Sequence, residues 1–302
     1  MLGWSVTPST LQRYRTHVDR FLDWFRASGE RAATTTELDE VTLDYIHHLY
    51  EQGQGRTAAA MTICGLQLLC VPDARFPRCR RALKGWAKRH PGRSHPPLSW
   101  ELTAAIAFQM SRSGLHRYAC GVLIGFDCLL RVSELCNLRR EDVADTGDLR
   151  IGVEHKGMML RLPSTKTGKN QWVEALDPCV IQLLRDRVRG TSPGARLFSY
   201  TASQFRRVFM ATCANLGLSK TYVPHSLRHG GATRYRHVLK WSIENVLERG
   251  RWVSTASARR YVQSGLAVLM SMEAPPAIAQ GGVVLAKRLY DALTLAQEQY
   301  TA

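Results

Sequence analysis

The sequence predicts a mainly α-helical protein with a small β-sheet, an α+β fold in which a helical domain precedes a mixed domain. Apolar residues recur at helical spacing through most of the 302 residues, and strand-like segments are confined to residues 150–175. A basic segment that ends in Pro-rich sequence separates the two parts, and a hydrophobic content of 45% is enough to form a core in each. We therefore expect a helical domain over 1–90, a linker over 91–97, a mixed domain over 98–274 and a tail helix over 275–302.

The net charge indicates a polyanionic partner. The formal charge is +16 and the pI is about 9.9, which leaves nucleic acid and anionic membrane as candidates. Membrane is disfavoured, because residues 1–5 do not begin an apolar signal segment and the most apolar run, 118–130, contains Asp127 and is too short to span. We expect a nucleic acid partner and an intracellular, reducing location: the nucleus in a eukaryote, the cytoplasm or nucleoid in a bacterium.

The cysteines argue against a metal centre. The chain has eight of them and no CxxC pair, so buried free thiols are expected in place of a zinc site. We expect no metal and no cofactor.

Four helices are predicted in the first domain, over 8–25, 37–51, 57–70 and 78–89. The first ends at Ser28-Gly29, and the third lies between Gly55 and Pro72.

The segment 75–93 contains eight Lys or Arg and no Asp or Glu. A solvated helix face is one interpretation; the nearby Trp86 and the basic character of the whole chain favour a surface that follows phosphates. The candidate DNA-binding residues in it are Arg78, Arg80, Arg81, Lys84, Lys88, Arg89 and Arg93.

The second domain begins with two predicted helices. The first, over 99–110, has Ser99 as its N-cap and Glu101 in its first turn. The second, over 118–130, is apolar on all sides and is expected to be a central core helix. Arg131 and Glu134 follow it, three residues apart in an apolar context. They form either an ordinary helical ion pair or a functional one, since a buried arginine needs a partner.

Strand-like segments follow at 150–154, 158–162 and 171–175, and the turn-rich link 164–170 predicts a hairpin whose lysines can reach into a cleft. Helices are predicted over 178–189 and 201–216, the latter ended by Gly217. In the tail, Pro275-Pro276 and Gly281-Gly282 are expected to break the chain before a last helix over 284–299. That helix can dock on its own domain or on a neighbouring subunit.

The stretch from His225 to Tyr261 carries residue types suited to phosphate chemistry. His225 and Arg228 are three apart and share a helix face, and Pro224 is a suitable helix start. Trp252 lies nine residues before Tyr261, and two arginines come directly before that tyrosine. A phenol among guanidinium groups can become a nucleophile.

This pattern, His225-x-x-Arg228, Gly250-x-Trp252 and then Tyr261, resembles the carboxy-terminal signature of the tyrosine recombinase (phage integrase) family, in its Trp form. The run Leu-Leu-Arg-x-x-Glu-Leu around Arg131 resembles that family's first arginine motif, in which the acidic residue, here Glu134, braces the arginine. The resemblance implies a catalytic set of Tyr261 as nucleophile with Arg131, Lys166, His225, Arg228 and Trp252.

The family has a catalytic lysine on a β-hairpin, and the position of Lys-Thr-Gly in this hairpin indicates Lys166. Lys169 is the second candidate and Lys156 the third. The alternative is that Lys166 is an ordinary surface lysine. Trp252 is a phosphate donor or a packing residue, since an indole can only donate. If Tyr261 is not the nucleophile, Tyr235 is the next candidate.

The resemblance further implies a core-binding domain and a catalytic domain that form a C-shaped clamp on double-stranded DNA. The expected function is site-specific recombination or integration through a 3′-phosphotyrosyl intermediate, without metal or ATP, by a homo-tetramer on paired sites in which the tail helix can take part. The alternatives are a type IB topoisomerase and a DNA-binding relative without catalysis. The run from His225 to Gly231 resembles recombinases of eukaryotic mobile elements.

Overall fold

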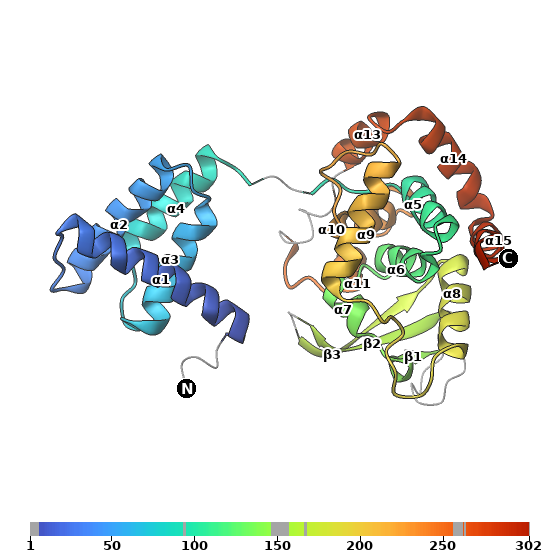
Figure 1. The fold of residues 1–302 in the computed structure, drawn as a ribbon, viewed down its shortest axis with the longest axis horizontal. Helices are drawn as coiled ribbons and strands as arrows, with labels where there is room; N and C mark the ends of the chain where they lie inside the picture. Colours follow the sequence, from blue (N-terminus) through green and yellow to red (C-terminus); the bar gives the residue numbers. More distant parts are fainter. Residues whose placement is uncertain are drawn as a thin grey trace. The chain divides into compact units, whose positions relative to one another are not determined.

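The computed structural model describes residues 6–92, 95–145, 157–165, 168–255, 262 and 264–301. The chain forms two compact units, divided between Arg93 and Ser94. Both are mainly helical, and the second also holds a small antiparallel sheet, so the predicted α+β class is confirmed (Figure 1). No helix within these ranges is long and apolar enough to cross a membrane.

The first unit contains α1 (Pro8–Ser28), α2 (Thr35–Glu51), α3 (Arg56–Leu69) and α4 (Pro77–Arg89), each within three residues of its predicted bounds. Gly29 ends α1 in the left-handed region with φ 72°, and Thr34 and Glu37 form a capping box at the start of α2. The core is an apolar cluster drawn from all four helices, which includes Phe21, Tyr45, Ile63, Leu66 and Cys79.

The start of α4 is fixed by a buried carboxylate. Asp39 of α2 accepts hydrogen bonds from the backbone nitrogens of Arg78 (2.9 Å) and Cys79 (3.2 Å). These are first-turn donors that lack partners within the helix, and the negative charge is favourable at a helix N-terminus. The basic helix is therefore held at a defined place on α2.

The second unit is built around one helix. The α-helices described before its tail are α5 (Trp100–Arg112), α6 (His116–Asp127), α7 (Val132–Asn137), α8 (Pro178–Arg189), α9 (Ala202–Asn215), α10 (His225–Thr233), which continues into a π-helical turn (Arg234–Val238), and α11 (Ile243–Gly250). Helices α5, α7, α8, α9 and α10 all pack on α6, which is the predicted central core helix (Figure 1).

The predicted end of that helix is wrong. It stops at Asp127, three residues short of the predicted 130, because Leu129 is left-handed with φ 49° and the Leu130 nitrogen donates to the Gly125 carbonyl (3.1 Å). Such a bond to the fifth preceding residue closes a helix end. Arg131 consequently lies outside that helix, as the N-cap of the separate short helix α7.

The sheet has the strand order β1 (Val143–Ala144), β2 (Met158–Thr165), β3 (Gly168–Ala175), and both pairs are antiparallel. The predicted strands 158–162 and 171–175 lie within β2 and β3, and the register runs from Met158 opposite Ala175 to Thr165 opposite Gly168. The predicted strand 150–154 lies outside the described residues. β1 was not predicted, because two residues cannot show an alternating pattern.

The tail consists of α13 (Ser264–Met272), α14 (Pro276–Lys287) and α15 (Leu289–Thr301). The predicted break at Gly281-Gly282 is wrong, because α14 runs through both glycines. A Cβ at Gly282 would lie 2.4 Å from the Glu101 carbonyl oxygen, so glycine lets α14 approach α5 closely. The predicted single helix 284–299 is likewise wrong, since the chain turns between Lys287 and Leu289. Leu289 and Leu293 are buried where α15 packs on α5 and α8 of its own unit.

Candidate active site

Arg131 and Glu134 are joined by two hydrogen bonds. The Arg131 backbone nitrogen donates to Glu134 Oε2 at 2.9 Å, and its guanidinium Nη1 donates to Oε1 at 2.5 Å. The Glu134 side chain is 3% exposed, whereas that of Arg131 is 22% exposed. The pair is therefore not an ordinary surface ion pair: a buried carboxylate holds an arginine that keeps part of its surface open to solvent.

Arg228 lies one helical turn after His225, as the spacing predicts, and is fully buried. Its two terminal nitrogens donate to the backbone carbonyls of Leu129 and Gly250. The guanidinium also lies over the Trp252 ring, 4.6 Å from its centroid. Because the side chain is fully buried, a phosphate could bind Arg228 only if the neighbouring groups moved to expose its guanidinium.

The electrostatic surroundings of His225 keep it neutral. Burial, followed by the positive charge of Arg228, the nearby His95 and Arg131, lowers its pKa from 6.5 to about 4. His229, whose ring centroid lies 5.2 Å from that of His225, has its pKa lowered to about 3, first by burial and then by His225. A neutral imidazole at physiological pH can accept a proton.

Trp252 packs in a small buried cluster with Leu129, Tyr235 and Val246. The ring lies so close to the Gly250 backbone that a Cβ there would be 1.8 Å from it, so glycine is needed at that position. Of the two predicted roles for Trp252, its position fits packing against Arg228.

Sequence reasoning missed two further arginines of the site. Arg249 donates to the Asp127 carbonyl at 2.7 Å, and Arg251 donates to the carbonyls of Leu129 (3.0 Å) and Cys128 (3.4 Å). Together with Arg228, they bind the carbonyls at the end of α6, where positive charge is favourable. The sequence feature that could have indicated them is the pair of arginines on either side of Gly250, at the end of an amphipathic helix.

Glu134 is shared between two arginines. Arg251 Nη2 donates to Glu134 Oε2 at 3.0 Å, so the carboxylate that holds Arg131 also binds Arg251. Burial alone would raise the pKa of Glu134, but the charge of Arg251 and the hydrogen bonds from Arg131 lower it overall. The carboxyl group is thus ionised and links the α7 turn to the segment after α11.

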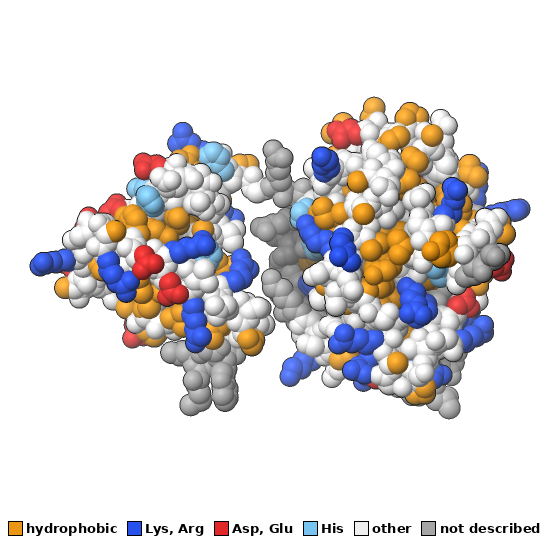
Figure 2. Space-filling view, in the orientation of Figure 1, with side chains coloured by type: hydrophobic (Ala, Val, Ile, Leu, Met, Phe, Trp, Pro, Cys, Tyr) orange, Lys and Arg blue, Asp and Glu red, His pale blue; other side chains and the backbone are white. Residues whose placement is uncertain are grey.

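The predicted basic residues of α4 fall into two groups. The Arg78 guanidinium is ion-paired with Glu40, and Arg80 donates to the Gln67 side chain (2.7 Å) and to the Arg75 carbonyl (2.8 Å). The others are exposed and form no ion pair within the described part of the chain: Arg81, Lys84, Lys88 and Arg89. On the second unit, the face shown in Figure 2 carries many Lys and Arg and few Asp and Glu.

Four predicted residues lie outside the described residues: Tyr261, Lys166, its alternative Lys156, and Arg93. The chain is described on either side of Lys166, where Thr165 pairs with Gly168, and Lys169 is exposed on β3. Within the described ranges, no group of three or more His, Cys, Asp or Glu side chains is placed to hold a metal ion.

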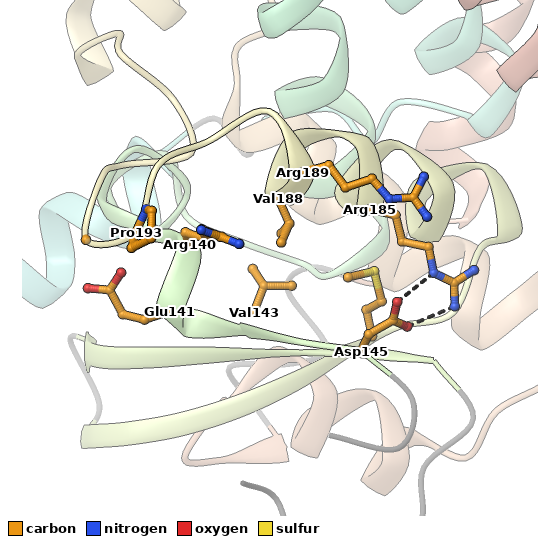
Figure 3. A pocket seen from close by; sticks show the side chains of 10 residues that line it. Arg140, Glu141, Val143, Asp145, Arg185, Val188, Arg189 and Pro193 are labelled. Atoms are coloured by element: carbon orange, nitrogen blue, oxygen red, sulfur yellow. Dashed lines mark hydrogen bonds and ion pairs between the residues drawn. The ribbon is translucent and has the colours of Figure 1, made fainter. Parts of the chain in front are cut away.

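A cavity of about 460 Å³ lies away from this site, between β1 and α8 (Figure 3). Arg185 and Asp145, joined by two hydrogen bonds of 2.8 Å, stand on its wall. No predicted site residue lines it. The cavity is therefore not part of the candidate active site.

Comparisons with known proteins give a family match and a likeness of fold. Residues 101–266 match the model of the phage integrase family. Similar solved structures include two of a lambda integrase dimer bound to a COC′ core site, with TM-scores of 0.58 and 0.56 and 15% identity. They cover 86% and 83% of this chain and 73% and 90% of the other. The Tn1549 transposon integrase in complex with circular intermediate DNA has a TM-score of 0.53 at 15% identity, covering 84% and 95%. At such identities the likeness is one of fold. Curated proteins gave no match.

Proposed function

Because this chain belongs to the phage integrase family, we propose that it is a site-specific DNA recombinase that breaks and rejoins double-stranded DNA through a 3′-phosphotyrosyl intermediate. The observation that carries the proposal is the meeting of three distant segments. Residues 129–134, 225–228 and 249–252 bring Arg131, His225 and Arg228 together around the end of α6. Such an arrangement of guanidinium groups and a neutral imidazole suits phosphoryl transfer.

The proposed chemistry assigns one role to each group. Tyr261 Oη attacks the scissile phosphorus, and His225 accepts the phenolic proton, which a free tyrosine holds with a pKa of about 10. The bond from phosphorus to the 5′-oxygen breaks, and Lys166 protonates the departing oxygen. Arg131 and Arg228 bind the nonbridging oxygens and stabilise the extra negative charge of the transition state. Guanidinium groups supply the positive charge, so the reaction as proposed needs neither a metal ion nor ATP.

The covalent intermediate keeps the energy of the broken bond. A 5′-hydroxyl from another strand can attack the phosphotyrosyl group, release Tyr261 and join the two strands. Exchange between two duplexes requires paired sites, so we propose a homo-tetramer on DNA. In the related structures, lambda integrase is a dimer on a core site and the Tn1549 integrase is bound to DNA.

We further propose that the two units close on the duplex as a C-shaped clamp, with the basic face of α4 against the phosphates. The tail helices pack on their own unit, so a contact between subunits would use their exposed side, which carries Val268, Leu269 and Val284.

The test is trapping of the intermediate on a nicked suicide substrate, after the target site has been selected from random DNA. The full chain should form a covalent adduct that Tyr261→Phe abolishes while DNA binding remains. Binding without an adduct from the unmutated chain would identify a catalytically inactive relative. A monomer that relaxes supercoils without exchanging strands would indicate type IB topoisomerase activity.

A further inference from the structure

We infer that Arg251 is a positioning residue for strand cleavage: through the shared carboxylate of Glu134 it fixes the place of Arg131. The inference rests on the proposed function, because it assigns Arg131 to the scissile phosphate. It concerns a residue that the sequence motifs leave unassigned, the central position of Gly250-x-Trp252.

The hydrogen bonds form a continuous path. Arg251 Nη2 reaches Glu134 Oε2 at 3.0 Å; the same oxygen accepts from the Arg131 backbone nitrogen at 2.9 Å, and Oε1 accepts from the Arg131 guanidinium at 2.5 Å. Arg251 is also anchored at its other side, to the Leu129 and Arg249 carbonyls, both at 3.0 Å. Arg251, at one end of the path, is therefore fixed to the backbone, and Arg131, at the other end, is the residue proposed to bind the scissile phosphate.

Burial makes this path strong and keeps Arg251 away from the substrate. The side chain of Arg251 is 4% exposed and that of Glu134 is 3% exposed, against 22% for Arg131. Charges at such depth are poorly screened, so removing one partner is costly. Arg131 can meet a phosphate without moving into the core, whereas Arg251 acts through its neighbour.

The backbone supports the same interpretation. Arg251 has φ 54°, in the left-handed region that a side chain rarely adopts. Its carbonyl contacts and its ion pair hold it there. A residue in this conformation is maintained by its surroundings, and here the surroundings are the groups that position Arg131.

Loss of Arg251 should change Glu134 first. Without the neighbouring charge, the pKa of Glu134 would rise, because Arg251 is the charge that contributes most to lowering it. Glu134 would then be left with Arg131 as its cationic partner, and the position of the Arg131 guanidinium would change. A displacement of about 1 Å at a positioning group can slow catalysis about a hundredfold.

Arg249 provides a matched control two residues away. Its side chain is 5% exposed, and like Arg251 it donates to a carbonyl at the end of α6, that of Asp127 at 2.7 Å. Its carboxylate partner is Asp127, at 3.6 Å, and not Glu134. Arg249 thus shares the structural role of Arg251 without the path to Arg131.

The experiment measures single-turnover cleavage of the nicked suicide substrate at saturating protein. It compares the normal linkage with a methylphosphonate, in which a methyl group replaces one nonbridging oxygen. That replacement removes the negative charge that Arg131 is proposed to stabilise, so defects in Arg131 should become smaller. Arg251→Met should be about a hundredfold slow on the phosphate and at least about tenfold less impaired on the methylphosphonate, as should Arg131→Ala.

Arg249→Met should be impaired equally on both linkages, as expected for a purely structural loss. Equal defects of Arg251→Met on the two substrates would overturn the inference and assign Arg251 to structure alone. If the unmutated chain forms no adduct with either substrate, the proposed function fails, and the inference that rests on it fails as well; a defect confined to the variants concerns the inference alone.

Thermal unfolding of each variant checks its fold. If Arg251→Met does not fold, Arg251→Lys replaces it. A lysine keeps the positive charge but lacks the planar guanidinium that donates two hydrogen bonds side by side. The cleavage rate of Arg251→Lys should therefore also be less impaired on the methylphosphonate than on the phosphate, with a smaller defect overall. In addition, Glu134→Gln combined with Arg251→Lys should be no slower than the worse single variant. Additive defects would show that the two residues act separately and would also overturn the inference.

Discussion

The phenolic hydroxyl of Tyr235 donates a 2.6 Å hydrogen bond to the carboxylate of Asp127, deep in the second unit. The other oxygen of Asp127 accepts from the backbone nitrogen of Leu176 at 2.9 Å. Burial, and then the negative charge of Asp127, raises the pKa of Tyr235. This phenol is a structural donor that joins the π-helical turn to α6, and a poor nucleophile, although the sequence alone leaves it as the second candidate after Tyr261.

Tyr235→Phe should keep the covalent adduct with DNA and lower the free energy of unfolding by about 1.5–3 kcal/mol, because it leaves a buried carboxylate short of one donor. Tyr261→Phe should do the reverse, abolishing the adduct with little effect on stability. Urea denaturation and adduct formation on the suicide substrate measure the two effects. A well-folded Tyr235→Phe protein that forms no adduct would reassign the nucleophile.

Stability should fall as the pH drops below 6.5, because His225 and His229 are held neutral. Their pKa values are lowered from 6.5 to about 4 and about 3, chiefly by burial. Between these values the unfolded chain binds protons that the folded chain does not, so the stabilisation is complete above pH 6.5 and is lost as the pH decreases. Each histidine contributes a slope of up to about 1.4 kcal/mol per pH unit.

Denaturant unfolding at several pH values between 6.5 and 4 tests this. The variant His225→Gln with His229→Gln should show a shallower decrease than the unmutated chain, even if it is less stable at neutral pH. The same slope in both proteins would mean that other groups determine the acid sensitivity.

Local patterns predicted the parts of the fold whose causes are local. Helix α8 has its predicted bounds, 178–189, because Pro178 starts it and its apolar residues recur at helical spacing. Arg131, His225 and Arg228 are predicted together because the order of their motifs along the chain is itself the pattern, and the structure brings them close to one another.

The remainder depends on contacts between distant residues. The left-handed Leu129 carries no mark of a helix end, since a leucine there reads as one more apolar helix residue. Arg251 and Glu134 are 117 positions apart, and Arg249 and Asp127 are 122 apart, so neither pairing shows in a local pattern. The sequence predicts a break at Gly282 because glycine is favoured both where helices pack closely and where a helix ends, and a local pattern does not distinguish the two.

Lys166→Ala should cleave ordinary DNA slowly and a 5′-bridging phosphorothiolate at a nearly normal rate. A general acid contributes roughly a hundredfold to ten-thousandfold to the departure of an alkoxide, whereas a thiolate leaves without protonation. Cleavage rates on the two substrates measure the rescue, and Lys169→Ala, on the exposed start of β3, is the matched control. Rescue of Lys169→Ala in place of Lys166→Ala would move the general acid to the other lysine of the hairpin.

The last prediction separates the basic residues of α4 by their partners. Arg81, Lys84 and Lys88 are exposed and, at spacings of three and four, share one face of the helix. Arg78 and Arg80 are bound to groups of their own unit, Glu40 and Gln67. Of these two groups, the first can contact phosphates without competition from an ion pair within the described residues.

Neutralising Arg81, Lys84 and Lys88 to Gln should therefore make the dependence of DNA affinity on salt shallower by about 2 to 3 in the slope of log K against log salt, because each phosphate contact contributes about 0.9. Arg78→Gln with Arg80→Gln should change that slope by less than about 1. Its effect should be on stability, by about 1 kcal/mol or less, as for other exposed pairs. Affinities measured over a range of salt concentrations, on specific and unrelated duplexes, give the slopes. Equal changes of the salt slope in both variants would show that net charge alone, and not one face of α4, determines DNA binding. An unchanged slope in the variant of Arg81, Lys84 and Lys88 would show that α4 does not contact the DNA.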